Sequence, residues 1–249
     1  MANPELLDVI DLHCHLLPGI DDGARTLDDA LAMVNYAINA GITKFVATPH
    51  ITPGRYDNSV ETIKPAFNLL KQAVNSNELA IEMAFAAEIR FDSVIIDMVN
   101  NDCLPYLGEY EGEQLILLEF PHSHIPAGYD QLIKWLAKKG IRVLIAHPER
   151  NRSVLGNIEM LKPLVELGCL FQITGGSLTG VFKDAARECA IELLKRDWVT
   201  IIASDAHNVR ARCPELEPAR QVAEEIIGEE LANQMVFDRP DAISRVHFN

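Results

Sequence analysis

Histidines and acidic residues recur at the ends of short apolar runs in this sequence. The first run ends in His13 and His15, with one residue between them, and the last run leads into Asp205 and His207. Residues two apart on a strand point to the same face, so each pair could hold one ion. Imidazole and carboxylate ligands together suit Zn²⁺, Mn²⁺ or Fe²⁺. This spacing predicts a metal site assembled from several strand ends.

Other apolar runs close with the same residue types. These further candidates are His50, Glu88, Glu119 and His147, and the acids Asp21 and Asp22 lie in the loop after the first run. A buried carboxylate without a partner is costly, which favours Glu88 and Glu119 as bridging ligands. A lone strand-end histidine is more often structural than a ligand, but a cluster of this size is typical of a site. Because it exceeds what one ion can coordinate, we expect two or three ions.

The pair His122 and His124 has the same spacing as the first pair but lies beyond a strand end, in a proline-flanked loop. Loops of this kind more often line a site than supply its ligands, so we expect these two residues at a substrate rim.

Short β-rich runs alternate with amphipathic stretches along the whole chain. The expected strands span residues 7–13, 44–48, 81–88, 114–119, 142–147, 170–174 and 199–204. The expected helices span residues 26–39, 58–75, 128–139, 153–167, 182–196 and 214–227. Continuous apolar strands are typical of parallel sheets covered on both faces. The pattern predicts an α/β fold with a single domain over residues 1–249.

Two α/β architectures share this alternation. A seven-stranded (β/α) barrel fits the length, since complete eight-stranded barrels take about 250 residues. A doubly wound open sheet has the same local pattern. The strand-end position of the candidate residues favours the barrel, because active sites of barrels lie at the carboxyl ends of their strands.

Charge and cysteine content exclude several classes of protein. The 249 residues carry 22 Lys and Arg against 36 Asp and Glu, a net charge of −14. This balance argues against binding nucleic acid or an anionic membrane through the general field. No secretory signal or apolar run of about 20 residues is visible, so we expect no membrane-embedded segment. The five scattered cysteines predict a reduced, cytoplasmic protein, and none begins the Cys-x5-Arg loop of cysteine-dependent tyrosine phosphatases.

The motifs, in this order, resemble the polymerase-and-histidinol-phosphatase (PHP) superfamily of metal-dependent phosphoesterases. They are HCH at 13–15, the Asp-Gly at 22–23, TPH at 48–50, the strand-end Glu88, HPER at 147–150 and SDAHN at 204–208. Within that superfamily, HCHLLPGIDDGA, LLEFP, HPER and SDAHN followed by Arg212 resemble bacterial tyrosine phosphatases of capsular polysaccharide loci. The similarity covers essentially the whole chain.

The resemblance implies a distorted seven-stranded TIM-like barrel, (β/α)7, with a trinuclear centre. Mn²⁺ is the expected metal, with Fe²⁺ or Zn²⁺ as other candidates. The implied ligand sets are His13, His15, Glu88 and Asp205 for one ion, Glu88, Glu119 and His147 for a second, and Asp22, His50 and His207 for the third. Asp22 is preferred over Asp21 because the family's loop acid precedes a glycine. One departure is that Ile51 follows His50, where the family often has a second histidine.

The resemblance also implies hydrolysis of phosphotyrosine by attack of a metal-bound hydroxide. Arg150 and Arg212 would clamp the phosphoryl oxygens, and Asp205 and His207 would complete the catalytic centre. Arg150 could instead pair with Glu149 or a neighbouring acid, and Arg212 could be an exposed loop residue. The expected substrate is a phosphotyrosine-bearing protein, a tyrosine kinase tail that controls capsular or exopolysaccharide synthesis.

Two other functions remain open. One is a small-molecule phosphomonoesterase such as a histidinol-phosphate phosphatase, and the other is a metal-binding module without catalysis. The sequence predicts no oligomeric state.

Overall fold

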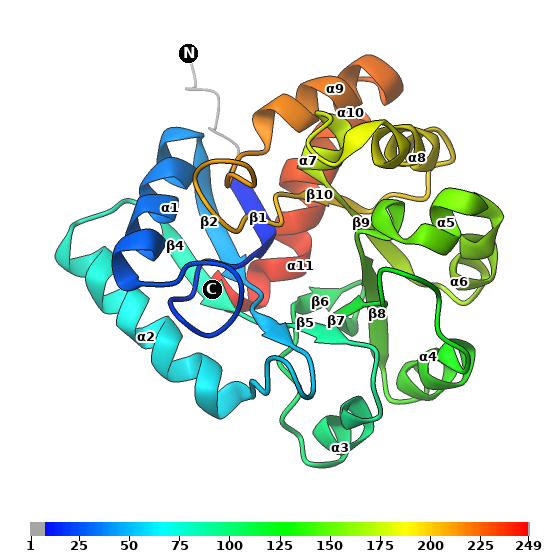
Figure 1. Cartoon of the computed structure of the whole chain (residues 1–249), viewed down its shortest axis with the longest axis horizontal. Helices are drawn as coiled ribbons and strands as arrows, with labels where there is room; N and C mark the ends of the chain where they lie inside the picture. The colour runs from blue at the N-terminus through cyan, green and yellow to red at the C-terminus, as the bar shows by residue number, and fades with distance from the viewer. Residues whose placement is uncertain (1–7, 249) are drawn as a thin grey trace.

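The computed structural model describes residues 8–248, which form a mixed α/β structure with parallel sheets (Figure 1). The strands are β1 (Val9–Cys14), β2 (Ile42–Ala47), β3 (His50–Ile51), β4 (Glu82–Phe85), β5 (Glu88–Arg90), β6 (Gly108–Tyr110), β7 (Glu113–Glu119), β8 (Ile141–Ala146), β9 (Leu170–Thr174) and β10 (Ile201–Ala203). The helices are α1 (Leu27–Asn39), α2 (Val60–Ser76), α3 (Val94–Asn100), α4 (Tyr129–Ala137), α5 (Arg152–Gly156), α6 (Lys162–Glu166), α7 (Gly175–Leu178), α8 (Lys183–Lys195), α9 (Glu217–Ile227), α10 (Glu229–Asn233) and α11 (Arg239–Phe248). The predicted alternation of strands and helices is confirmed.

The strands pair as two sheets. One has the order β1-β2-β4, and the other has the order β10-β9-β8-β7-β5-β3 with β6 antiparallel to β7. Pro49 separates β2 from β3 and has no amide hydrogen to donate to a ladder. The predicted strand 81–88 is likewise divided into β4 and β5. A closed seven-stranded sheet is therefore not present among the paired strands of residues 8–248.

Strands β1 and β10, at the ends of the two sheets, are linked by a few contacts. Cys14 and Ala206 form an isolated parallel bridge. The carboxylate of Asp11 accepts hydrogen bonds from the Ser204 amide, at 3.0 Å, and from the Ser204 hydroxyl. The loop after β10, which carries two predicted ligands, is thus tied to β1, which carries His13 and directly precedes His15.

Local sequence explains where several helices begin and end. Thr26 caps α1, because its hydroxyl accepts from the Asp29 amide and the Asp29 carboxylate accepts from the Thr26 amide. The predicted helix 153–167 is wrong as one element, because it breaks into α5, a 3₁₀ turn and α6. Asn157 caps the 3₁₀ turn and Pro163 lies at the start of α6. Strands β3 and β6 and helices α3, α7, α10 and α11 were not predicted, and Leu7 of the predicted first strand lies outside the described residues.

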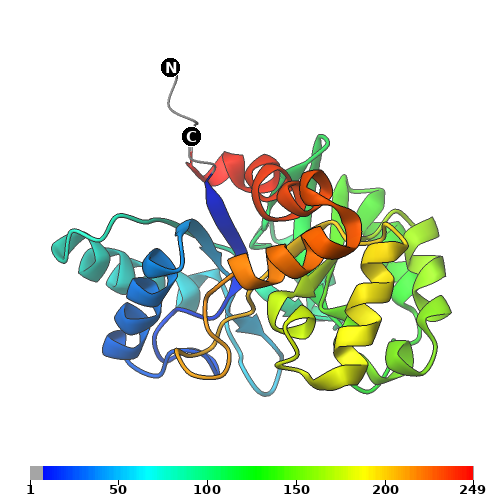
Figure 2. The same cartoon turned by 90° about the horizontal axis from the view of Figure 1, so that it is seen from above.

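An inner apolar cluster lies between the strands and extends to α11. It includes Leu12 of β1, Leu115 and Leu117 of β7, Leu144 of β8 and Ile243 of α11. Helix α11 lies across the amino ends of the strands, on the side opposite to the carboxyl-end loops (Figure 2). This helix closes one end of the inner cluster, so the carboxyl ends are the open face. Of the helices in residues 8–248, none is both long and apolar enough to span a bilayer.

Candidate metal centre

Strand alternation brings two glutamates to the centre of the open face. Leu115 and Leu117 belong to the inner cluster, and Glu119 follows two residues later at the end of β7. Ala84 and Ala86 belong to the same cluster, and Glu88 follows two residues later in β5. Each carboxylate therefore continues an inward-facing row. Glu88 has 0% and Glu119 has 2% of its surface exposed.

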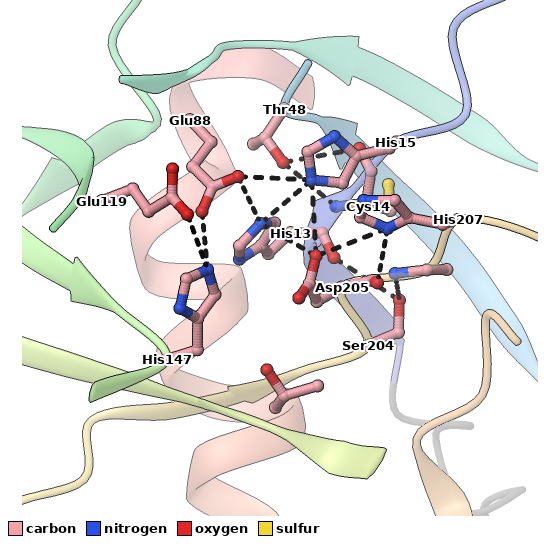
Figure 3. Close-up of polar contacts among 12 residues, drawn as sticks. His13, Cys14, His15, Thr48, Glu88, Glu119, His147, Ser204, Asp205 and His207 are labelled. Atoms are coloured by element: carbon pink, nitrogen blue, oxygen red, sulfur yellow. Dashed lines mark hydrogen bonds and ion pairs between the residues drawn. The ribbon is translucent and has the colours of Figure 1, made fainter. Parts of the chain in front are cut away.

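Two other ligand candidates are placed by unusual backbone conformations. His147 has φ 34° and Asp205 has φ 51°, in the left-handed region that non-glycine residues seldom adopt. Ala146, which precedes His147, already faces the inner cluster, so regular alternation would turn His147 outward. The left-handed turn instead directs its ring to the centre, where Nε2 lies 2.7 Å from Glu88 Oε1 (Figure 3).

The first histidine pair meets Glu88 and Asp205. The two Nε2 atoms of His13 and His15 lie 3.3 Å apart. Each lies 3.4 Å from Glu88 Oε2, and they lie 3.3 and 3.4 Å from Asp205 Oδ1 (Figure 3). The Nδ1 atom of His13 contacts the Gln172 side-chain oxygen at 2.9 Å. Both imidazoles thus present Nε2 to the same space.

Asp21 and Asp22 occupy different positions in the loop after β1. Asp22 Oδ1 lies 3.3 Å from His50 Nε2 and 3.5 Å from His207 Nε2. Asp21 lies behind the ring of His15, with Oδ2 2.7 Å from its Nδ1. Asp22 therefore faces the candidate ligands. Asp21 orients one of them through the outer ring nitrogen of His15, as the carboxylate behind a metal-bound histidine does.

A glycine allows this loop to fold back onto β1. A Cβ atom at position 23 would lie 2.0 Å from the carbonyl oxygen of His15. The Gly23 amide donates to Asp21 Oδ1 at 2.9 Å. Only glycine permits such an approach, which gives a structural reason for the Asp-Gly of the motif.

Four overlapping groups of side chains could each hold a cation. They are His15, Asp22, His50 and His207; His13, His15 and Glu88; His13, His147 and Asp205; and His50, Glu88 and Glu119. Within residues 8–248 these groups contain all nine predicted ligands and no other residue. They divide the ligands differently from the three predicted sets, since His147 groups with His13 and Asp205.

Several buried polar atoms at this centre have no hydrogen-bond partner. They are His50 Nδ1, Glu88 Oε2, Glu119 Oε2 and Asp205 Oδ2. Such atoms are costly unless something compensates them. His50 Nδ1 and Glu88 Oε2 lie 2.9 Å apart without hydrogen-bond geometry, as ligands that face a common ion do. Glu119 Oε2 and Asp205 Oδ2 instead lie beside arginine guanidiniums. The donor set and these orphaned atoms fit divalent cations.

Burial and mutual charge shift the pKa values at the centre. Burial opposes protonation of His50, but Glu88 and Asp22 raise its pKa to about 9. Burial and the charge of Glu88 raise the pKa of Glu119 to about 7. Burial and the nearby charge of Arg150 lower the pKa of His147 to about 3. The metal-free centre therefore holds protons on some ligands, which cations would displace.

Two arginines converge on the side of the centre formed by Asp205. The Nη2 atoms of Arg150 and Arg212 lie 2.7 and 2.6 Å from Asp205 Oδ2. Their guanidinium carbons lie 4.6 and 5.6 Å from the ring centroid of Phe182, as in cation–π contacts. Arg150 does not pair with Glu149, whose carboxylate accepts from Ser177 and Thr174. Both guanidiniums therefore face the centre.

Other side chains of this cleft were not predicted from the sequence. Arg90 lies 3.1 Å from Glu119, and the Tyr56 ring stacks on His50 with centroids 5.4 Å apart. His122 lines the cleft as expected, whereas His124 is not among its lining residues. Gln172 is a polar residue inside the apolar run of β9. That pattern could have predicted its place beside the ligands. No sequence signal points to Phe182, because its role depends on where two distant loops meet.

The parallel α/β fold with clustered histidines and carboxylates at its open face defines the class of metal-dependent hydrolases. Residues 9–245 match the family model described as capsular polysaccharide synthesis, CpsB/CapC, and the chain belongs to this family. The expected resemblance to capsule-locus phosphatases is thereby confirmed.

Named relatives agree with this assignment. Tyrosine-protein phosphatase YwqE of Bacillus subtilis is 34% identical over 93% of this chain and 95% of its own. Putative tyrosine-protein phosphatase CapC of Staphylococcus aureus is 33% identical over 82% of this chain and 79% of its own. A crystal structure from work on YwqE and Streptococcus pneumoniae CpsB, described as unique metal-dependent tyrosine phosphatases, matches with TM-score 0.88 and 33% identity, over 95% of this chain and 94% of that one. An amidohydrolase from Mycoplasma synoviae, 13% identical with TM-score 0.59 over 96% and 88% of the chains, shares the fold alone.

Proposed function

We propose that this protein is a metal-dependent tyrosine-protein phosphatase that hydrolyses phosphotyrosine in proteins. The observation that carries the proposal is the convergence of Arg150 and Arg212 beside a buried cluster of cation ligands. A guanidinium binds two phosphoryl oxygens at once. Two such groups beside several cations suit a dianionic phosphomonoester. The relatives named tyrosine-protein phosphatases support the same activity.

The nine side chains at the centre would hold two or three divalent ions, with Mn²⁺ as the expected metal. When bound, the ions would activate water as a nucleophile and neutralise charge on the phosphoryl group. Glu88 would bridge, because its carboxylate contacts four of the histidines. Arg150 and Arg212 would turn from Asp205 to the phosphoryl oxygens. The tyrosine oxygen leaves readily as a phenolate, since the pKa of phenol is about 10.

We also propose how the whole chain is organised. The contacts of Asp11 with Ser204 and of Cys14 with Ala206 support a distorted seven-stranded barrel formed by one domain. The cysteines are all free, which supports a reduced, cytoplasmic location. The family's description names capsular polysaccharide synthesis, so the proposed substrate is a tyrosine kinase of that process.

Phosphate release from a phosphotyrosine peptide, measured with Mn²⁺ and with a chelator, tests the activity. We expect turnover with Mn²⁺, loss with the chelator and loss in His207→Ala. The exposed Arg245 of α11 provides a control, since Arg245→Ala should retain full activity. Faster turnover of histidinol phosphate than of the peptide would instead establish the small-molecule phosphatase. Metal binding without any phosphatase activity would instead support the alternative of a metal-binding module without catalysis.

A further inference from the structure

A groove of about 540 Å³ adjoins the candidate catalytic cleft. It lies between the start of α1 and the loop that follows β10. Figures 1 and 2 both place this loop beside the loop that follows β1. Asp22 and His207 line both the groove and the cleft. The groove and the cleft are therefore continuous at Asp22 and His207, which are two of the ligands expected for the third ion.

The groove has two free positive charges. Arg25 and Arg210 line it, and both are exposed. Neither guanidinium forms an ion pair or a hydrogen bond with a residue in the described part of the chain. The two acids of the groove are engaged, since Asp29 accepts from the Thr26 amide and Asp22 contacts two histidines. In a chain of net charge −14, the charges that line this groove, two arginines and two aspartates, balance, and only the arginines lack a partner among the described residues.

Apolar atoms contribute the remaining lining. Ala32 on the α1 side and Val209 on the opposite side, which is 38% exposed, present apolar surface to the groove, whereas Ala24 and Met33 are almost fully buried. A groove with apolar walls and two arginines suits an extended peptide that carries carboxylates.

We propose that this groove binds the substrate segment next to the phosphotyrosine, and that Arg25 and Arg210 select acidic residues there. This inference rests on the proposed phosphatase activity. A phosphotyrosine whose phosphate lies at the centre must lead its main chain over the rim, and this groove opens directly from the cleft. Carboxylates of the segment would pair with the two guanidiniums, whose geometry matches them.

The test compares three substrates with the intact protein and Mn²⁺. They are free phosphotyrosine, a phosphotyrosine peptide with Asp and Glu flanks, and the same peptide with Asn and Gln flanks. We expect a lower KM for the acidic peptide. The double variant Arg25→Glu with Arg210→Glu should raise that KM about tenfold, because it replaces attraction by like-charge repulsion. Turnover of free phosphotyrosine should not change.

A charge-matched control separates the groove from the general field. Lys134→Glu with Arg245→Glu makes the same charge change on α4 and α11, and should leave the peptide preference unchanged. Equal KM values for the two peptides with the wild-type protein would overturn the inference, as would an equal effect of both double variants. Failure to hydrolyse any of the three substrates would instead reject the phosphatase activity on which the inference rests.

Discussion

Glu88 and His147 form a buried pair, with Oε1 and Nε2 only 2.7 Å apart. The second oxygen of Glu88 lies 2.9 Å from His50 Nδ1 and 3.4 Å from His13 and His15. One carboxylate therefore contacts four imidazoles that come from β1, β3 and the end of β8. No other described carboxylate contacts as many histidines, which makes Glu88 the common member of the proposed ion sites.

Glu88→Gln should remove more than one ion. The amide keeps the side-chain volume but loses the negative charge and one acceptor oxygen, so it cannot bridge two cations. We expect the metal content per chain to fall, by elemental analysis, together with at least a hundredfold loss of kcat. Glu225→Gln, which makes the same change at an exposed position of α9, is the matched control. Unchanged metal content in Glu88→Gln would contradict the bridging assignment.

Arg150→Lys and Arg212→Lys should each weaken catalysis without removing metal. Lysine keeps the charge but not the paired donors that bind two phosphoryl oxygens. Loss of one positioned donor to a reacting oxyanion costs about a hundredfold or more in rate. We expect a fall of that order in kcat/KM for phosphotyrosine, with metal content as in the wild type. A large loss of metal would show that the arginines act through Asp205 rather than on the substrate.

Metal affinity should rise with pH between about 6 and 9. In the metal-free protein the pKa of His50 is raised to about 9 and that of Glu119 to about 7. Both groups hold a proton below these values, and a cation must displace it to bind. Calorimetric titration with Mn²⁺ in two buffers of different ionisation enthalpy measures the released protons. Release that does not decrease as the pH rises through this range would contradict the prediction.

The sequence predicted the ligand positions better than it predicted their partners. His13, Glu88 and Asp205 stand out because polar residues end apolar runs, and this signal is local. The contact of Arg150 and Arg212 with the same oxygen of Asp205 depends on two loops that are far apart in the chain, and no local pattern encodes it. The division into two sheets was missed for the same reason, since strand pairing depends on tertiary contacts.

Phe182→Leu should weaken phosphate binding more than it affects the metal centre. The ring faces the guanidinium carbons of both Arg150 and Arg212, and leucine fills similar space without a π face. Each contact of this kind contributes about 0.5–1 kcal/mol at an exposed site, so losing both should raise KM and the inhibition constant of inorganic phosphate about five- to thirtyfold.

Two further variants test whether Phe182 acts by holding the arginines. Phe182→Tyr keeps the aromatic face and should restore phosphate inhibition to nearly the wild-type value. Gly176→Ala should weaken phosphate inhibition less than Phe182→Leu does, because a Cβ atom at position 176 would lie 3.1 Å from Phe182 Cε2 and would shift the ring by only a few tenths of an ångström. Metal content measured for all three variants should equal that of the wild type. If Phe182→Leu and Phe182→Tyr weaken phosphate inhibition equally, the ring packs in the fold without positioning the two guanidiniums.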